Sequence, residues 1–296
     1  GTFVALLLLI AACLFLERMG DLDFLDDPGS IPTAAPVAPA EGTLEVRILD
    51  VGQGDSILIQ TGEKAVLIDA GERDQGQTVC DYLKSAGVEK LDLVIATHPH
   101  SDHIGGMPDV LSRFGADEIL MPQMAEDMVP TTSVFNRLLD AVETQGIPVT
   151  AAQPGLAYDL GSGAKLTVLA PLQDYDDLNN YSVVCRLDCG ETSFLFTGDA
   201  EKQVEQDLIS EGTQLQADVL KAGHHGSNTS SCDVFLNAVS AKIAAVSCGQ
   251  DNDYGHPHKE TLELLQEDRV TTLRTDQQGD IAVFSDGNDV TYKTAA

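Results

Sequence analysis

The chain has 296 residues, of which 43% are hydrophobic and 22% are charged, a balance typical of a folded globular protein and not of a disordered one. Its 17 basic and 47 acidic residues give a formal net charge of −30 at pH 7. Broad nucleic-acid-binding faces need clustered Lys and Arg, so this composition argues against such a face.

An unbroken apolar segment, FVALLLLIAACLFL, occupies residues 3–16. Its length suits the core of a signal peptide better than a membrane span of roughly 20 residues. We therefore interpret residues 1–18 as a signal peptide or a membrane anchor, and the alternative of a buried core helix is weaker. The string IAAC also resembles a lipobox with Cys13 as the lipidated residue. The chain is expected to be exported, either extracellular or held at the membrane through this end.

A tether is predicted to follow the apolar segment. Pro, Ala, Gly and Asp dominate residues 19–42, and no apolar period is visible there. This composition is typical of an extended, semi-rigid linker. A single globular domain is then predicted over residues 43–296.

From residue 43 the pattern changes to short β-strands that end at glycine, predicted at 43–52, 55–62 and 64–71. A helix is predicted over 74–86, ending before Gly87. The nearly continuous apolar run at 91–98 predicts a strand buried on both faces.

The remainder of the domain alternates between strands and helices. Further strands are predicted at 118–122, 148–150, 156–159, 165–170, 181–189, 192–197, 217–221, 242–247, 270–274, 280–285 and 289–293. Further helices are predicted at about 104–113, 131–145, 200–210, 231–239 and 258–267. Many short strands with interspersed helices indicate an α/β (α+β) domain with two sheets and helices on the outside.

Three of the seven histidines fall within the stretch THPHSDHIGG, directly after the predicted buried strand. Imidazole and carboxylate are the ligands that a borderline dication such as zinc prefers. The H-x-H-x-D-H order lets His98 and His100 bind one metal while Asp102 and His103 bind a second, adjacent one. The alternative is a polar loop in which Asp102 caps the next helix, but a cap requires no histidines.

This string resembles the signature of the metallo-β-lactamase superfamily. The strings ILDVGQGDSILIQ, THPHSDHIGG, NNYSVV, LFTGD, LKAGHHGS and YGHPH occur in one order, as in the hydrolase-like domain of the competence protein ComEC and its stand-alone exported relatives. The resemblance covers roughly residues 44–285. It implies a four-layer αββα sandwich.

The resemblance also assigns roles to residues outside the histidine stretch. Asp69 matches the aspartate that orders the histidine loop, and Asp199 matches the aspartate that bridges two metals. Of the adjacent His224 and His225, one would bind the second metal, with His225 slightly favoured, and the other would contact substrate or donate a hydrogen bond to a ligand. His256 would contact substrate or protonate the leaving group, although a simple helix-entry turn explains it equally well.

One departure from metallo-β-lactamases proper is the lack of any histidine between residues 104 and 223. The corresponding place is NNYS, so Asn179, Asn180 and Ser182 are predicted to contact substrate, as is Ser227 in GHHGS. The first metal would then have His98, His100 and Asp199, completed by an asparagine oxygen or water. Two divalent metals are expected, with zinc favoured and manganese as the alternative in an oxygen-rich site.

The predicted function is a metal-dependent hydrolase, a phosphodiesterase or nuclease in which a metal-bound hydroxide attacks phosphorus. Asp102, Asp199 and His256 are the predicted catalytic residues. The expected substrates are nucleic acid, a nucleotide or a phosphate ester of the cell wall. A hydrolase of an ester, lactone or lactam is the first alternative, and a non-catalytic metal-binding module is the second. The oligomeric state is left open.

Overall fold

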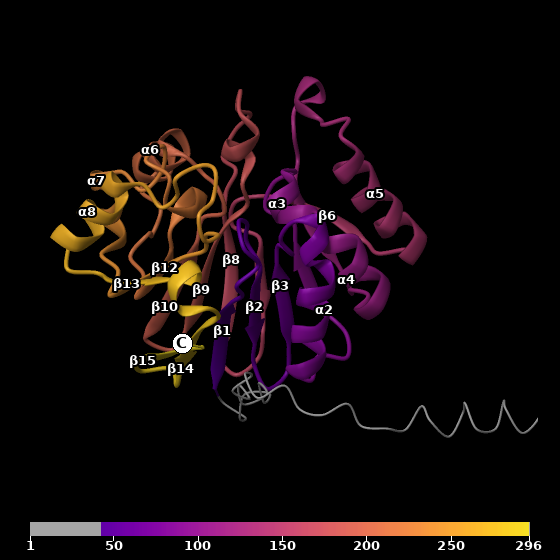
Figure 1. Cartoon of the computed structure of the whole chain (residues 1–296), viewed down its shortest axis with the longest axis horizontal. Coiled ribbons are helices and arrows are strands. Elements are labelled where there is room, and N and C mark those ends of the chain that lie inside the picture. The colour runs from indigo at the N-terminus through magenta and orange to yellow at the C-terminus, as the bar shows by residue number, and fades with distance from the viewer. Residues whose placement is uncertain (1–42, 296) are drawn as a thin grey trace, which may run out of the picture. The chain divides into compact units, whose positions relative to one another are not determined.

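The structure is a computed structural model that describes residues 43–295, and in that part of the chain two β-sheets face each other with helices on their outer sides (Figure 1). The first sheet has the order β15-β14-β1-β2-β3-β4-β5-β6. Its strands are β1 (Leu44–Ile48), β2 (Ile57–Gln60), β3 (Ala65–Ile68), β4 (Leu93–Ile95), β5 (Ile119–Pro122), β6 (Val149–Ala152), β14 (Ile281–Ser285) and β15 (Val290–Thr294).

The second sheet has the order β13-β12-β11-β10-β9-β8-β7. Its strands are β7 (Ala157–Asp159), β8 (Ala164–Ala170), β9 (Val184–Cys189), β10 (Thr192–Phe196), β11 (Val219–Lys221), β12 (Ile243–Val246) and β13 (Thr271–Arg274). The α-helices are α2 (Gly76–Ser85), α3 (Ser101–Ile104), α4 (Met107–Phe114), α5 (Ser133–Gln145), α6 (Lys202–Ser210), α7 (Asp233–Val239), α8 (Lys259–Glu267) and α9 (Thr275–Gln278). Short 3-10 turns are η1 (Arg73–Gln75), η2 (Glu126–Met128), η3 (Leu178–Tyr181) and η4 (Gly223–Gly226).

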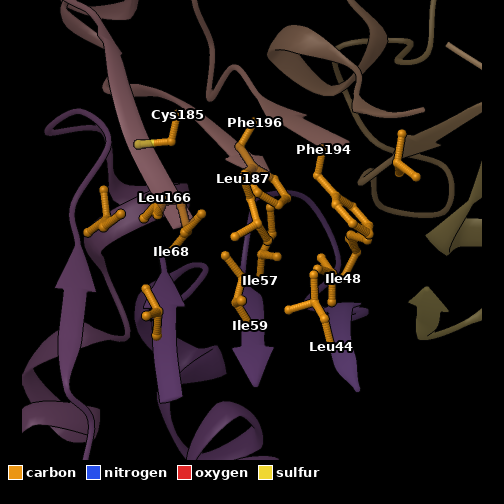
Figure 2. Packing of buried hydrophobic residues seen from close by; sticks show 14 of the residues in the cluster. Leu44, Ile48, Ile57, Ile59, Ile68, Leu166, Cys185, Leu187, Phe194 and Phe196 are labelled. Carbon is orange, nitrogen blue, oxygen red and sulfur yellow. The ribbon is translucent and has the colours of Figure 1, made fainter. Parts of the chain in front are cut away.

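The central core lies between the two sheets (Figure 2). Strand side chains alternate between faces, so Val66 and Ile68 of β3 enter this core while Leu67 points to the opposite, helix-covered face. Phe194 of β10 comes from the facing sheet and is fully buried. Replacing such a phenylalanine by alanine would cost about 3 to 5 kcal/mol, because it leaves a cavity between the layers.

Helices cover the outer face of each sheet. Val79 of α2 and Val110 of α4 pack in one cluster with Leu67 and Val94 of the first sheet. On the other side, α6, α7 and α8 pack on the second sheet through Leu208, Phe235 and Leu265. The two helical layers and two sheets form the four-layer αββα sandwich, and this fold prediction is confirmed.

The helix predicted at about 104–113 was wrong in its bounds, because the chain forms two short helices, α3 and α4, separated by Gly105 and Gly106. A Cβ on Gly105 would lie 2.4 Å from the Arg73 nitrogen, and one on Gly106 would lie 2.3 Å from the Ala70 oxygen. Only glycine allows this close approach of the two backbones. The strand predicted at 181–189 begins at Val184 instead, since η3 precedes it.

The predictions for residues 1–18 and 19–42 lie outside the described residues. Among residues 43–295, no helix combines the length and the apolar character that a membrane span requires.

Candidate metal centre

The predicted site residues follow the ends of neighbouring strands. Asp69 comes directly after β3 and His98 shortly after β4, and these two strands are parallel neighbours in the first sheet. Asp199 and His225 follow β10 and β11, which are parallel neighbours in the second sheet. Because the carboxyl ends of parallel strands meet at one edge of a sheet, these loops converge there.

Asp69 fixes the position of the histidine loop through hydrogen bonds to Thr97 and His103. Its backbone is left-handed, with φ 57°, and its side chain is fully buried. One carboxylate oxygen accepts hydrogen bonds from the Thr97 hydroxyl at 2.6 Å and from His103 Nδ1 at 2.7 Å, and the other accepts from the Thr97 backbone nitrogen at 2.9 Å. Asp69 thereby fixes the His103 tautomer and directs Nε2 of that ring into the site.

Four residues bring ligand atoms within 4.8 Å of one another: Asp102, His103, Asp199 and His225. Asp199 Oδ2 lies 3.3 Å from His103 Nε2 and 3.4 Å from His225 Nε2. Asp102 Oδ2 lies 3.2 Å from His225 Nε2. The second half of the predicted two-metal site is therefore assembled as one compact group.

His98 and His100 form the other half. His98 Nε2 lies 3.0 Å from His100 Nδ1, so two imidazole nitrogens point at the same place. His98 Nε2 is also 3.9 Å from Asp199 Oδ2, which puts Asp199 between the two halves. Burial and the neighbouring His103 hold the pKa of His98 well below its usual value, so this ring is neutral, as a metal ligand must be.

The adjacent His224 and His225 both adopt left-handed backbone conformations, with φ 47° and 54°. This irregular turn lets both rings face the site from one segment. His225 Nδ1 donates to the Ser247 carbonyl oxygen at 2.9 Å, which leaves Nε2 free towards Asp102 and Asp199. His224 lies nearer the rim, with Nδ1 3.1 Å from the Thr229 hydroxyl. His225 belongs to the group that could hold a metal ion, while His224 Nε2 lies 3.6 Å from Asp199 Oδ2 beside it.

A buried ion pair lies behind His225. Lys221 Nζ is 2.7 Å from Asp55 Oδ2, and Asp55 Oδ1 is 3.4 Å from His225 Nδ1. Lys221 was not among the residues predicted from sequence. A lysine in the apolar strand LKA, three positions before the histidine pair, was the available signal, since a lysine in a buried strand needs a partner.

An open cavity of about 310 Å³ leads to these groups. Its lining includes the predicted residues His100, Asp102, Asn179, Asp199, His224, His225 and His256, and the unpredicted residues Gln53, Ser101 and Tyr254. Among the described residues that line it, none is Lys or Arg. An anion bound in this cavity would therefore have no Lys or Arg side chain of the lining to pair with.

The other predicted substrate contacts lie outside this lining. Asn180 accepts a hydrogen bond from the Glu201 backbone nitrogen at 3.0 Å. Ser182 Oγ accepts from the Asp199 backbone nitrogen at 3.0 Å and lies 3.4 Å from His98 Nδ1. Ser227 Oγ lies 3.0 Å from the Thr229 hydroxyl. These contacts support the loops that carry metal ligands and do not reach the cavity.

His256 lies at the cavity wall, 9% exposed, with Nδ1 3.5 Å from Gln53 Nε2. Burial, together with the neighbouring rings of His225 and His224, lowers its pKa to about 4. The ring is therefore neutral near pH 7, which suits a group that contacts substrate better than one that donates a proton.

The donor set fits divalent metal. His103 Nε2, His225 Nε2 and Asp199 Oδ1 are buried without a hydrogen-bond partner in residues 43–295. Buried polar atoms are normally satisfied, and a metal would satisfy these. Burial opposes charge on His103 and His225, but the carboxylates around them, Asp199 first, outweigh burial and raise both pKa values well above the usual range. The site thus attracts positive charge at its centre.

Comparison with known proteins agrees with the fold and the site. Residues 49–250 match the family model of the metallo-beta-lactamase superfamily. ComE operon protein 3 of Bacillus subtilis (strain 168) is 32% identical over 265 residues, which cover 83% of this chain and 33% of that protein. Competence protein ComA of Neisseria gonorrhoeae is 33% identical over 248 residues, which cover 82% of this chain and 33% of that protein.

The chain thus spans about a third of the length of these curated relatives. The crystal structure of the metallo-beta-lactamase fold protein YhfI from Bacillus subtilis has the same fold, with a TM-score of 0.51 and 15% identity over 84% of this chain and 100% of that one. The fold implies a centre for two divalent metals, and the ligand groups described above are the residues that would hold them. The chain belongs to the metallo-β-lactamase superfamily and is a hydrolase-fold relative of the competence proteins.

Proposed function

We propose that this protein is a metal-dependent phosphodiesterase that acts on nucleic acid. The observation that carries the proposal is the cavity, whose floor holds carboxylates and imidazoles for metal and whose described lining has no Lys or Arg. A phosphodiester is an anion, and because the described lining has no Lys or Arg, a dinuclear metal centre would supply the positive charge that binds it. The relatives named as competence proteins, and the resemblance to the ComEC domain, support nucleic acid as the substrate.

The proposed reaction converts water and a phosphodiester into a phosphomonoester and an alcohol. Bound divalent metals supply Lewis acidity and lower the pKa of a water molecule. Asp102, His103, Asp199 and His225 would hold one metal, and His98 and His100 would contribute to the other, with Asp199 between the two groups. Zinc is proposed, with manganese as the alternative.

Two neutral side chains are proposed to orient the substrate. Asn179 lines the cavity, and its Oδ1 is buried without a hydrogen-bond partner in residues 43–295. His256 stands on another wall and is neutral near pH 7. The neutral His256 ring can donate a hydrogen bond to a phosphate oxygen, whereas Asn179 Oδ1 can accept one only from a donor such as a sugar hydroxyl or a water.

The substrate class is tested with the full chain, stripped of metal and reloaded in parallel with zinc, manganese or magnesium. Each sample is given bis-4-nitrophenyl phosphate, a single-stranded oligonucleotide and a chromogenic cephalosporin. We expect turnover of the two phosphodiesters and none of the cephalosporin. Turnover of the cephalosporin alone would favour a lactam hydrolase, and no turnover with any metal would refute the proposal.

The matched variants are Asp199→Asn and Asp81→Asn. Asp199 lies at the centre of the ligand group, so its substitution is expected to reduce phosphodiester turnover by about 100-fold or more. Asp81 pairs with Arg113 on the surface, at 3.3 Å, and its loss should leave turnover unchanged. Equal activity in the two variants would show that another site performs the reaction.

We also propose that the reaction takes place outside the cell membrane, on the basis of the apolar segment at residues 3–16 alone. Fractionation of cells that produce the full chain tests this placement. Recovery of the protein from the cytosol would contradict it.

A further inference from the structure

Tyr254 is an exposed aromatic residue in the lining of the cavity. It lines the cavity together with His224, His225 and Asp199, yet its side chain is 67% exposed. The ring stacks on His256, with centroids 5.6 Å apart and an interplanar angle of 22°. One part of this aromatic side chain thus rests on a buried ring while the rest faces solvent at the rim.

The Asn252 side chain stabilises the loop that carries Tyr254 through four hydrogen bonds to the loop backbone. Asn252 Oδ1 accepts hydrogen bonds from the backbone nitrogens of Tyr254 at 3.2 Å and His256 at 3.0 Å. Asn252 Nδ2 donates to the carbonyl oxygens of Gly249 at 2.9 Å and His256 at 2.6 Å. An exposed aromatic ring on a fixed loop is a preorganised binding surface, because little conformational freedom remains to be lost when a ligand stacks on it.

His256 joins this surface to the metal ligands. Its ring centroid lies 5.4 Å from that of His224, 6.1 Å from that of His225 and 5.6 Å from that of Tyr254. Gln53 supports the same wall by accepting a hydrogen bond from the Gly249 backbone nitrogen at 3.1 Å. If the reacting group of a chain-like ligand lay beside His225, the neighbouring monomer of that ligand would therefore lie within reach of the Tyr254 ring.

We propose that Tyr254 is a base-stacking platform, and that the nucleobase next to the scissile phosphate lies on its exposed face. This role rests on the proposed phosphodiesterase function. Base–aromatic stacking does not depend on the sequence of the bases or on phosphate contacts, so it suits a strongly acidic protein whose described cavity lining has no Lys or Arg. A cavity of about 310 Å³ is near the lower limit for small-ligand pockets, so most of a strand must lie outside it, past this rim.

The test compares the metal-loaded full chain with its Tyr254→Ala and Tyr254→Phe variants. The substrates are a short single-stranded oligothymidylate and the same strand with tetrahydrofuran abasic residues on both sides of the cleaved bond. Tyr254→Ala should lower kcat/KM on the normal strand by roughly 5- to 100-fold, mainly through KM, and Tyr254→Phe should lower it little. On the abasic strand Tyr254→Ala should cause no further loss.

Tyr292→Ala is the matched control, because this tyrosine on β15 is 46% exposed and lies outside the cavity lining. An equal loss on normal and abasic strands would overturn the proposal, since Tyr254 would then contact the sugar or only support His256. No loss on either strand would also overturn it.

If no phosphodiester is cleaved, the proposed function is refuted, and the stacking role of Tyr254 is tested separately by measuring oligonucleotide binding. Fluorescence anisotropy then measures the Kd of labelled normal and abasic strands for the zinc-loaded chain. Tighter binding of the normal strand than of the abasic strand, with the difference lost in Tyr254→Ala, would support the stacking role. Identical Kd values for the two strands would refute it.

Discussion

Lys221 Nζ lies 2.7 Å from Asp55 Oδ2, and the two side chains are only 1% and 2% exposed, directly behind His225 of the candidate metal centre. Burial alone would raise the pKa of Asp55, but the charge of Lys221 and the contact with His225 outweigh burial and hold it at about 2. Asp55 is therefore ionised at neutral pH and presents negative charge to the back of the His225 ring. The pair ties the strand β11 to the turn that follows β1.

Lys221→Met tests the value of this pair for stability. The substitution leaves the Asp55 carboxylate buried without its main partner, and breaking such a pair costs about 3 to 5 kcal/mol. Urea unfolding of the metal-free chain measures the change in the free energy of unfolding. Lys242→Met is the control, because Lys242 is 68% exposed in its pair with Asp218 and its loss should cost about 1 kcal/mol or less. Equal costs would contradict a buried, ionised pair.

Metal binding is expected to release protons. The raised pKa values of His103 and His225 mean that both rings hold protons at pH 7 without metal, and a metal must displace them. Affinity should therefore rise with pH through the neutral range. Calorimetry in two buffers of different ionisation enthalpy should give about one to two protons released for the first metal bound.

The two halves of the site provide the control for this count. His225→Ala should reduce the number of released protons by about one. His98→Ala should leave it unchanged, because the pKa of His98 is held well below its usual value and this ring is already neutral. Release of no protons by the wild-type chain would mean that the carboxylates do not charge these rings.

His256→Gln separates two roles for His256. With a pKa of about 4, the ring is neutral at pH 7 and is expected to orient substrate, so the variant should lose about 10-fold or less in kcat. The loss should be similar for a nitrophenolate and an alkoxide leaving group. A general acid would instead contribute about 100- to 10,000-fold, and chiefly for the poorer alkoxide leaving group. A strong dependence on the leaving group would therefore reverse this assignment.

Salt dependence tests how a chain with a net charge of −30 meets a polyanion. The Debye length falls from about 30 Å at 0.01 M to about 8 Å at 0.15 M ionic strength, which screens the repulsion between protein and strand. At saturating metal, kcat/KM for an oligonucleotide should rise over this range. For bis-4-nitrophenyl phosphate, which carries one charge, it should change much less. A steep fall with salt would indicate a basic binding face instead.

The sequence predicted the architecture because its pattern is local and periodic. The apolar run at 91–98 predicted a strand buried on both faces, and β4 is buried in this way. Which strand ends meet at the site came from the resemblance to the metallo-β-lactamase superfamily and not from the local pattern. The helix bounds near Gly105 were wrong, because that break depends on the backbone of Ala70 and Arg73, which lie far from it in sequence. No local pattern encodes such a contact.

The same limit applies to the site. His98, His100, Asp102 and His103 are close in sequence and were found directly, and His225 followed from the resemblance. Lys221 pairs with Asp55, which is distant in sequence, so a lysine in an apolar strand indicates a buried partner without identifying it. Tyr254 was missed because an exposed tyrosine in a polar loop has no sequence pattern that distinguishes it from other surface residues. Ser182, which follows η3, does not line the cavity. Its hydroxyl accepts a hydrogen bond from the Asp199 backbone nitrogen in the loop after β10.

We propose that Asp102, His103, Asp199 and His225 hold a metal that the chain needs for phosphodiester hydrolysis. Bound metal and bis-4-nitrophenyl phosphate hydrolysis can be followed in the same samples as zinc or manganese is added to the chelated full chain. Turnover should rise in step with bound metal, and His225→Ala should lose both together. Metal that binds in a His225-dependent way without any phosphodiester turnover would contradict the claim.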